Sequence, residues 1–143
     1  MRGRATAGLI AGLLILPSSA HAAPFVATLK APTHHPKANR LWPITVTART
    51  RSGKALHATA TYKFLYNGQV VQTTYPSPKA DPNSACSKKG TCRHSPYPFR
   101  GRFRDPSIVW PARSVGFPLT FRVIVAVKGM GHVNLDYAVR VRR

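Results

Sequence analysis

The sequence predicts an all-β protein folded as an antiparallel β-sandwich of about seven strands. Short runs in which apolar and polar residues alternate are separated by Gly, Pro and Asn-rich turns. An Asn-Gly pair, Asn67-Gly68, lies between two β-prone runs, which is the strongest short signal for a hairpin. No segment shows the 3.6-residue period of a helix, so the strands must cover one another in two layers.

The segment 115–143 carries the clearest alternation. Because side chains alternate in an extended chain, two sets of apolar residues share one face of a hairpin: Phe121, Val123, Val125 and Val127, then Val133, Leu135, Tyr137, Val139 and Val141. Burial of each contributes roughly 1.5 to 3 kcal/mol as an upper estimate. A lone hairpin cannot realise this burial, so a second sheet has to cover it.

Two strands are expected near the start of the predicted domain. Phe25–Lys30 is the first, and the proline-rich segment 31–36 after it is a loop. Leu41–Thr50 is the second, half-buried through four residues on one face: Trp42, Ile44, Val46 and Ala48. Residues 51–54 supply the turn that follows.

The Asn-Gly turn joins the next pair of expected strands. His57–Tyr66 is rich in Thr and aromatic residues, and Gln69–Tyr75 is its partner. Further along, Phe99–Arg104 resumes extended structure, which Ile108–Trp110 continues. Residues 111–116 then turn the chain into the closing hairpin.

A long surface loop is expected over residues 76–98, which contain five prolines. Cys86 and Cys92 lie in it, and in an exported chain such a pair usually forms a disulfide. The bond would shape the loop and restrict the unfolded chain by roughly 2 kcal/mol. Long loops often carry function, so this one is a candidate binding surface.

Residues 1–22 have the pattern of a signal peptide. Arg2 and Arg4 precede a short apolar run, 9–16, and small residues follow it. Cleavage is expected before Ala23, with a cut before His21 as the alternative. The apolar run is too short to span a membrane. The sequence therefore predicts one domain, 23–143, that is secreted as a soluble protein. Association with the cell wall is the alternative location outside the cell.

The chain is strongly basic. It has 22 Lys and Arg against three aspartates and no glutamate, a formal net charge of +19. Loss of Arg2 and Arg4 with the signal peptide leaves 20 basic residues and a net charge of +17. This predicts salt-sensitive attraction to polyanions such as anionic wall polymers or nucleic acid. A compositional bias with no selected partner is the alternative.

A candidate polyanion site combines loop and strand residues. Arg100, Arg102 and Arg104 alternate, so on one continuous strand they would share a face at about 7 Å spacing. Lys88, Lys89 and Arg93 from the preceding loop would extend this surface. This spacing of the arginines is comparable to the phosphate repeat of an extended polyanion, and guanidinium groups bind phosphate in a bidentate way. The alternative is an ordinary charged strand that resists aggregation.

Catalytic chemistry has little support in the sequence. Three scattered aspartates provide no carboxylate pair for acid–base work, and no nucleophile or phosphate-loop motif is present. Asp105 and Asp136 are expected to be turn or ion-pair residues. A non-enzymatic protein without a cofactor is therefore predicted.

Histidines suggest one alternative function. If cleavage exposes His21 as the first residue, its amine and ring could bind copper together with a second imidazole, from His34, His35, His57, His94 or His132. His34 and His35 lie in the proline-rich loop, where surface histidines without a ligand are also common. The alternative function is thus a secreted copper-binding β-sandwich.

Several motifs together resemble the bacterial immunoglobulin-like and fibronectin-III-like domains of small secreted actinobacterial proteins. They lie at residues 42–46, 67–71, 110–112, 115–121 and 135–139. The resemblance covers about residues 25–143 and implies an immunoglobulin-like sandwich with Greek-key connections. It departs from antibody domains because no cysteine pair links the two sheets. It implies a binding or structural module at the cell envelope, with an unknown protein partner as one possible ligand.

Overall fold

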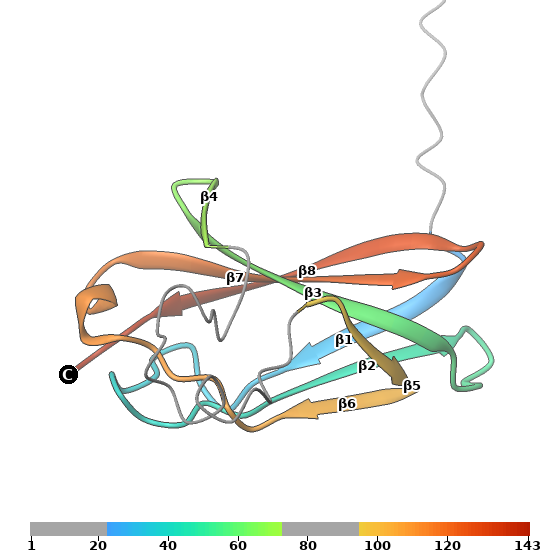
Figure 1. The fold of residues 1–143 in the computed structure, drawn as a ribbon, viewed down its shortest axis with the longest axis horizontal. Coiled ribbons are helices and arrows are strands. Elements are labelled where there is room, and N and C mark those ends of the chain that lie inside the picture. Colours follow the sequence, from blue (N-terminus) through green and yellow to red (C-terminus); the bar gives the residue numbers. More distant parts are fainter. Residues whose placement is uncertain (1–22, 73–94) are drawn as a thin grey trace, which may run out of the picture.

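The computed structural model describes residues 23–72 and 95–143, which form an antiparallel β-sandwich (Figure 1). Its strands are β1 (Phe25–Lys30), β2 (Ile44–Thr50), β3 (His57–Tyr66), β4 (Gln69–Gln72), β5 (Tyr97–Arg100), β6 (Arg102–Asp105), β7 (Pro118–Val127) and β8 (Gly131–Arg140). A single 3-10 turn, Ala112–Ser114, precedes β7. The predicted all-β sandwich is confirmed.

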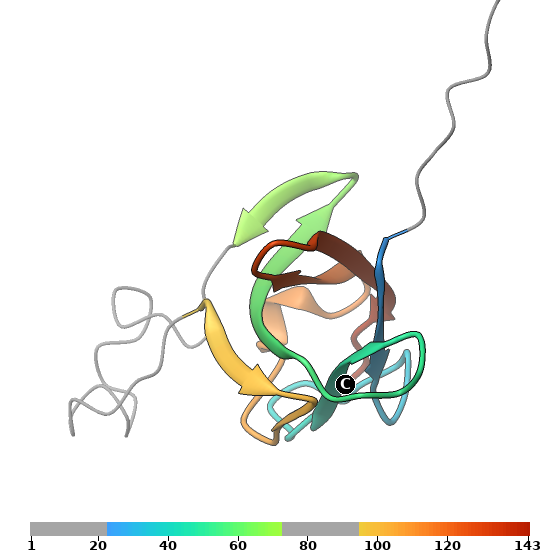
Figure 2. The ribbon, with the colours of Figure 1, turned by 90° about the vertical axis from the view of Figure 1, so that its right-hand side faces the viewer.

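Two layers form the sandwich. One contains β1, β2 and β6, and the other contains β5, β3, β7 and β8, with β4 pairing to the far end of β3. Seen along its length, the sheet curls around the core (Figure 2). The layers are linked where β5 turns into β6, through the single residue pair Arg100 and Arg102.

The core lies between the layers and is built on Phe121. Its ring lies 5.6 Å from that of Trp42, 5.1 Å from Tyr62 and 5.2 Å from Phe64, measured between centroids. Trp110 closes the cluster against Phe64 at 5.4 Å. These edge-on and tilted arrangements are the ones that aromatic quadrupoles favour. The inward residues of β2 and β7 predicted from alternation are all buried.

The closing hairpin has the predicted apolar face, and the structure adds its register. Phe121 lies opposite Tyr137, and Val123 lies opposite Leu135. The β3–β4 turn is also as predicted, since Asn67 and Gly68 both have positive φ, at 49° and 75°. The first strand, β1, has the predicted bounds.

Four predicted boundaries differ from the structure. The second strand was expected to begin at Leu41, but β2 begins at Ile44. The long loop was expected to reach residue 98, but β5 begins at Tyr97, because Tyr97 and Pro98 pair with Ala60 and Thr59 of β3. Residues 108–110 form no regular strand, although Val109 makes an isolated bridge to Leu41. The expected straight run Phe99–Arg104 is interrupted at Gly101.

Candidate functional surface on the first layer

The outer face of the β1-β2-β6 layer is basic and rich in threonine. In each strand the apolar residues point into the core, so the alternate residues point to solvent. We call the resulting surface the basic face. It consists of Lys30, Arg49, Arg102 and Arg104 with Thr28, Thr45 and Thr47.

Strand register arranges these residues in rows across the layer. Thr45 of β2 lies between Lys30 of β1 and Arg104 of β6. The neighbouring row is Thr28, Thr47 and Arg102. Adjacent strands are about 4.8 Å apart, and alternate residues on one strand are about 7 Å apart. Lys30, Arg102 and Arg104 each therefore lie directly opposite a threonine, whereas Arg49 lies opposite Val26 and its guanidinium donates to the carbonyl oxygen of Gly53 at 3.0 Å.

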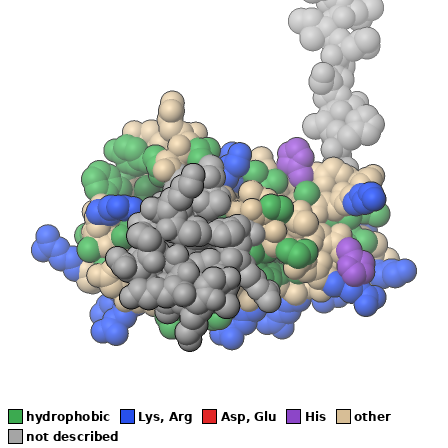
Figure 3. Space-filling model, viewed as in Figure 1, with side chains coloured by type: hydrophobic (Ala, Val, Ile, Leu, Met, Phe, Trp, Pro, Cys, Tyr) green, Lys and Arg blue, Asp and Glu red, His purple; other side chains and the backbone are tan. Residues whose placement is uncertain are grey.

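No carboxylate neutralises this face within the described part of the chain. Asp105 ends β6 but points inward, and only 8% of its surface is exposed. Asp136 lies on β8, where both of its oxygens accept hydrogen bonds from Arg122, at 2.6 and 2.7 Å. In the space-filling view, Lys and Arg side chains follow the edge where β6 lies, and no acidic side chain is visible there (Figure 3).

The Arg122–Asp136 pair confirms the expected ion-pair role of Asp136. Hydrogen bonds from the guanidinium lower the pKa of the Asp136 carboxyl, and the carboxylate raises the pKa of Arg122. Asp105 is instead buried, and its side chain stabilises the turn that follows β6. The backbone N–H and the hydroxyl of Ser107 both donate to its Oδ1, at 2.9 and 2.5 Å.

The three arginines predicted to share one strand face are divided by the structure. Gly101 has φ of +68° and bends the chain, so Arg100 ends β5 while Arg102 and Arg104 belong to β6. The premise of one continuous stripe is therefore wrong. The remaining residues of that predicted site, Lys88, Lys89 and Arg93, lie outside the described residues, as do Cys86 and Cys92.

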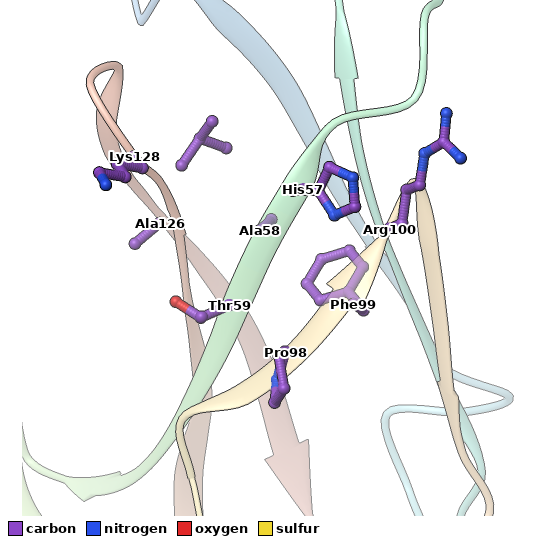
Figure 4. Close-up of a pocket in the computed structure, with 9 residues that line it drawn as sticks. His57, Ala58, Thr59, Pro98, Phe99, Arg100, Ala126 and Lys128 are labelled. Atoms are coloured by element: carbon purple, nitrogen blue, oxygen red, sulfur yellow. The ribbon is translucent and has the colours of Figure 1, made fainter.

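Arg100 instead borders a shallow hollow on the second layer. The hollow has a volume of about 650 Å³ and is open to solvent, with small residues such as Thr59 and Ala126 on its surface. Arg100 and His57 lie on one side, and Lys128 lies on the other (Figure 4). These cationic and imidazole groups suit an anion, but no carboxylate lines the hollow to provide acid–base chemistry.

The histidines of the predicted copper site are only partly described. His34 stacks on Tyr137 with ring centroids 4.0 Å apart, and its Nδ1 lies 2.7 Å from the carbonyl oxygen of Ala138. That contact makes Nδ1 the donor, which leaves Nε2 as the ring's acceptor. His35 is exposed, and His21 lies outside the described residues. Within residues 23–72 and 95–143, no group of three potential ligands gathers.

Comparison with known proteins gives no relative: no family model matches the chain, and no curated protein matches it. The immunoglobulin-like and fibronectin-III-like resemblance therefore stays a prediction. Among the described residues, no helix has the length and apolar character needed to cross a membrane.

Sequence reasoning missed most of the basic face. Arg102 and Arg104 were predicted, whereas Lys30, Arg49 and the threonines were not. Their signal was present, because Thr and Lys or Arg alternate with the apolar residues of Phe25–Lys30 and Ile44–Thr50. Only the pairing of β2 with both β1 and β6 joins these polar positions into one surface.

Proposed function

We propose that this protein is a non-enzymatic binding module that attaches to anionic polymers of the cell envelope through the basic face. The observation that carries this proposal is the set of four exposed cations on the outer face of one layer with no described carboxylate among them. Export, predicted from residues 1–22, would expose this face to wall polymers.

Electrostatics favours a polymer over a small anion. Each exposed cation gains little from a single counter-charge in water, because solvent and salt screen the pair. A polyanion contacts several cations at once and releases its condensed counterions, so its affinity rises with every contact. The net charge of +17 that is expected after removal of residues 1–22 adds long-range attraction and speeds encounter.

The test measures binding to immobilised heparin over a range of salt concentrations. The variant Arg49→Gln/Arg102→Gln/Arg104→Gln removes three charges from the basic face. Its matched control, Arg140→Gln/Arg142→Gln/Arg143→Gln, removes three exposed charges from the end of the chain. Both variants thus carry the same net charge.

The face variant is expected to lose about tenfold or more in affinity and to show a shallower salt dependence, since fewer counterions are released. The control is expected to lose less than about threefold. Equal losses would show that total charge, rather than the basic face, drives binding. Unchanged binding in the face variant would overturn the proposal.

A further inference from the structure

We propose that the polymer bound by the basic face is a hydroxyl-rich anionic polysaccharide. This inference rests on the proposed function, because it specifies the ligand of the same surface. It is carried by the threonine hydroxyls between the cations, by the absence of aromatic side chains among the described residues of the face, and by the spacing of the cations.

The threonines provide hydrogen-bonding groups beside the charges. The hydroxyl oxygens of Thr28 and Thr47 lie 2.6 Å apart, so one hydroxyl donates to the other and a second proton remains for a ligand. Thr45 makes no side-chain hydrogen bond within the described part of the chain and lies between Lys30 and Arg104. Thr45, and whichever of Thr28 and Thr47 keeps its proton free, can both donate to and accept from a sugar hydroxyl, which a cation cannot do.

Nucleic acids fit this surface less well. Single strands are held by bases stacked on aromatic side chains, and the outward positions of β1, β2 and β6 are Val, Thr, Lys and Arg. Sequence reading of a duplex needs a helix or ribbon that enters a groove, whereas the basic face is the side of a three-stranded layer. A nucleic acid would be held through its phosphates alone, by the cations and by hydroxyls that donate to phosphate oxygens, and its bases would have no aromatic partner on the face.

The spacing of the cations also favours a sparsely charged chain. Arg102 and Arg104 are about 7 Å apart along β6, and Lys30 and Arg104 lie two strands apart, at about 10 Å. Polysaccharides with one carboxylate on each sugar place uncharged hydroxyls between their charges. Inorganic polyphosphate carries a charge on every unit and has no such hydroxyls along its length.

The experiment compares two probes, polygalacturonate and inorganic polyphosphate, at one salt concentration. The variant Thr45→Val/Thr47→Val removes hydroxyls and keeps all charges, and valine preserves the β-branched shape that suits a strand. The control variant Thr61→Val/Thr120→Val makes the same change on the second layer, on β3 and β7. Thermal melting verifies that all variants are folded.

We expect the Thr45→Val/Thr47→Val variant to lose roughly 25-fold in affinity for polygalacturonate, as two hydrogen bonds of about 1 kcal/mol imply at 1.4 kcal/mol per tenfold. Its affinity for polyphosphate should fall by less than about fivefold, because phosphate oxygens can accept from the threonines but donate nothing to them, and the control should retain both affinities. Equal effects on the two probes, or no effect on either, would overturn the inference.

The arginine variant separates this inference from the proposed function. If Arg49→Gln/Arg102→Gln/Arg104→Gln abolishes binding of both probes and the valine variant changes neither, the polyanion function stands and the polysaccharide assignment fails. If the arginine variant keeps its affinity for both polygalacturonate and polyphosphate, the proposed function itself fails. Tighter binding of a single-stranded DNA oligonucleotide than of polygalacturonate at the same salt concentration would also overturn the assignment.

Discussion

The hydroxyl of Tyr62 donates a hydrogen bond of 2.9 Å to Oδ2 of Asp105 across the interior of the sandwich. Tyr62 lies on β3 in the second layer, and Asp105 ends β6 in the first, so this bond joins the two layers. Asp105 is the one charged residue among the buried residues described. Because buried carboxylates are costly without partners, the hydroxyl is expected to stabilise the end of β6.

Replacing Tyr62 with phenylalanine should therefore destabilise the fold by about 1 to 3 kcal/mol, as expected when a buried charged acceptor loses a donor. The ring and its contact with Phe121 are retained, so little of this cost should come from packing. Urea denaturation measures the change. Tyr66→Phe is the control, because that tyrosine is 37% exposed. Equal effects of the two substitutions would refute the role of the buried bond.

The same bond predicts loss of stability in alkali. Burial raises the pKa of Tyr62 above its ordinary value, and the nearby Asp105 charge and hydrogen bond raise it further. Burial, with a smaller effect of Asp105, raises the pKa of Tyr97 to about 12. Both groups are raised in the folded state, so their contribution is complete below pH 10 and is lost as pH rises above it.

Thermal melting between pH 8 and about pH 12 tests this prediction. The wild type should lose melting temperature above about pH 10 more steeply than Tyr62→Phe, because the variant lacks one group that must ionise on unfolding. Tyr66→Phe should follow the wild type. Parallel curves for the wild type and Tyr62→Phe would contradict the prediction.

The two buried tryptophans provide a comparison of hydrogen bonding at similar burial. Nε1 of Trp42 donates to the carbonyl oxygen of Thr33 at 2.9 Å, whereas Nε1 of Trp110 is buried with no partner within the described residues. Each substitution by phenylalanine removes similar ring volume. Trp42→Phe also removes a hydrogen bond, and Trp110→Phe removes an unsatisfied donor that costs free energy to bury.

Trp42→Phe is therefore expected to destabilise the protein by about 1 to 3 kcal/mol more than Trp110→Phe. Urea denaturation of both variants measures the difference, and their slopes with denaturant concentration should agree, since the surface exposed on unfolding is similar. A larger cost for Trp110→Phe would indicate that packing outweighs hydrogen bonding at these sites.

The predictable parts of the fold depend on local patterns. Ile44, Val46 and Ala48 alternate with polar residues, so their burial follows from strand geometry alone. Asn67 and Gly68 tolerate positive φ, which specifies the turn without reference to distant residues. Strand existence and the inward faces could therefore be predicted before the structure.

The basic face could be predicted only in part, because it depends on contacts between distant segments. Lys30 and Arg104 come together only because Thr45 pairs with both. The bend at Gly101 also could not be predicted from the sequence, because a glycine in an alternating run is equally compatible with a straight strand. At the bend a Cβ would meet Ala55, a residue far away in sequence that approaches Gly101 only in the fold.

Gly101 is expected to be required at the corner that separates Arg100 from Arg102. Its φ is +68°, and a Cβ at this position would lie 2.7 Å from Cβ of Ala55. Gly101→Ala should combine the strain of positive φ, about 1 kcal/mol or more, with an overpacking cost of about 1 to 3 kcal/mol. Gly68→Ala is the matched control, because φ there is +75° and no atom lies within 4 Å of its added Cβ.

Urea denaturation of the two glycine variants should thus show the larger loss for Gly101→Ala, the excess reporting the contact with Ala55. The double variant Gly101→Ala/Ala55→Gly removes the approaching Cβ and leaves Cα of Ala55 at 3.5 Å, an ordinary contact. It should regain part of the stability, as expected for directly coupled neighbours. If the two single variants lose the same free energy and the double variant regains none, the corner is set by backbone conformation alone, and Ala55 has no part in dividing the arginines.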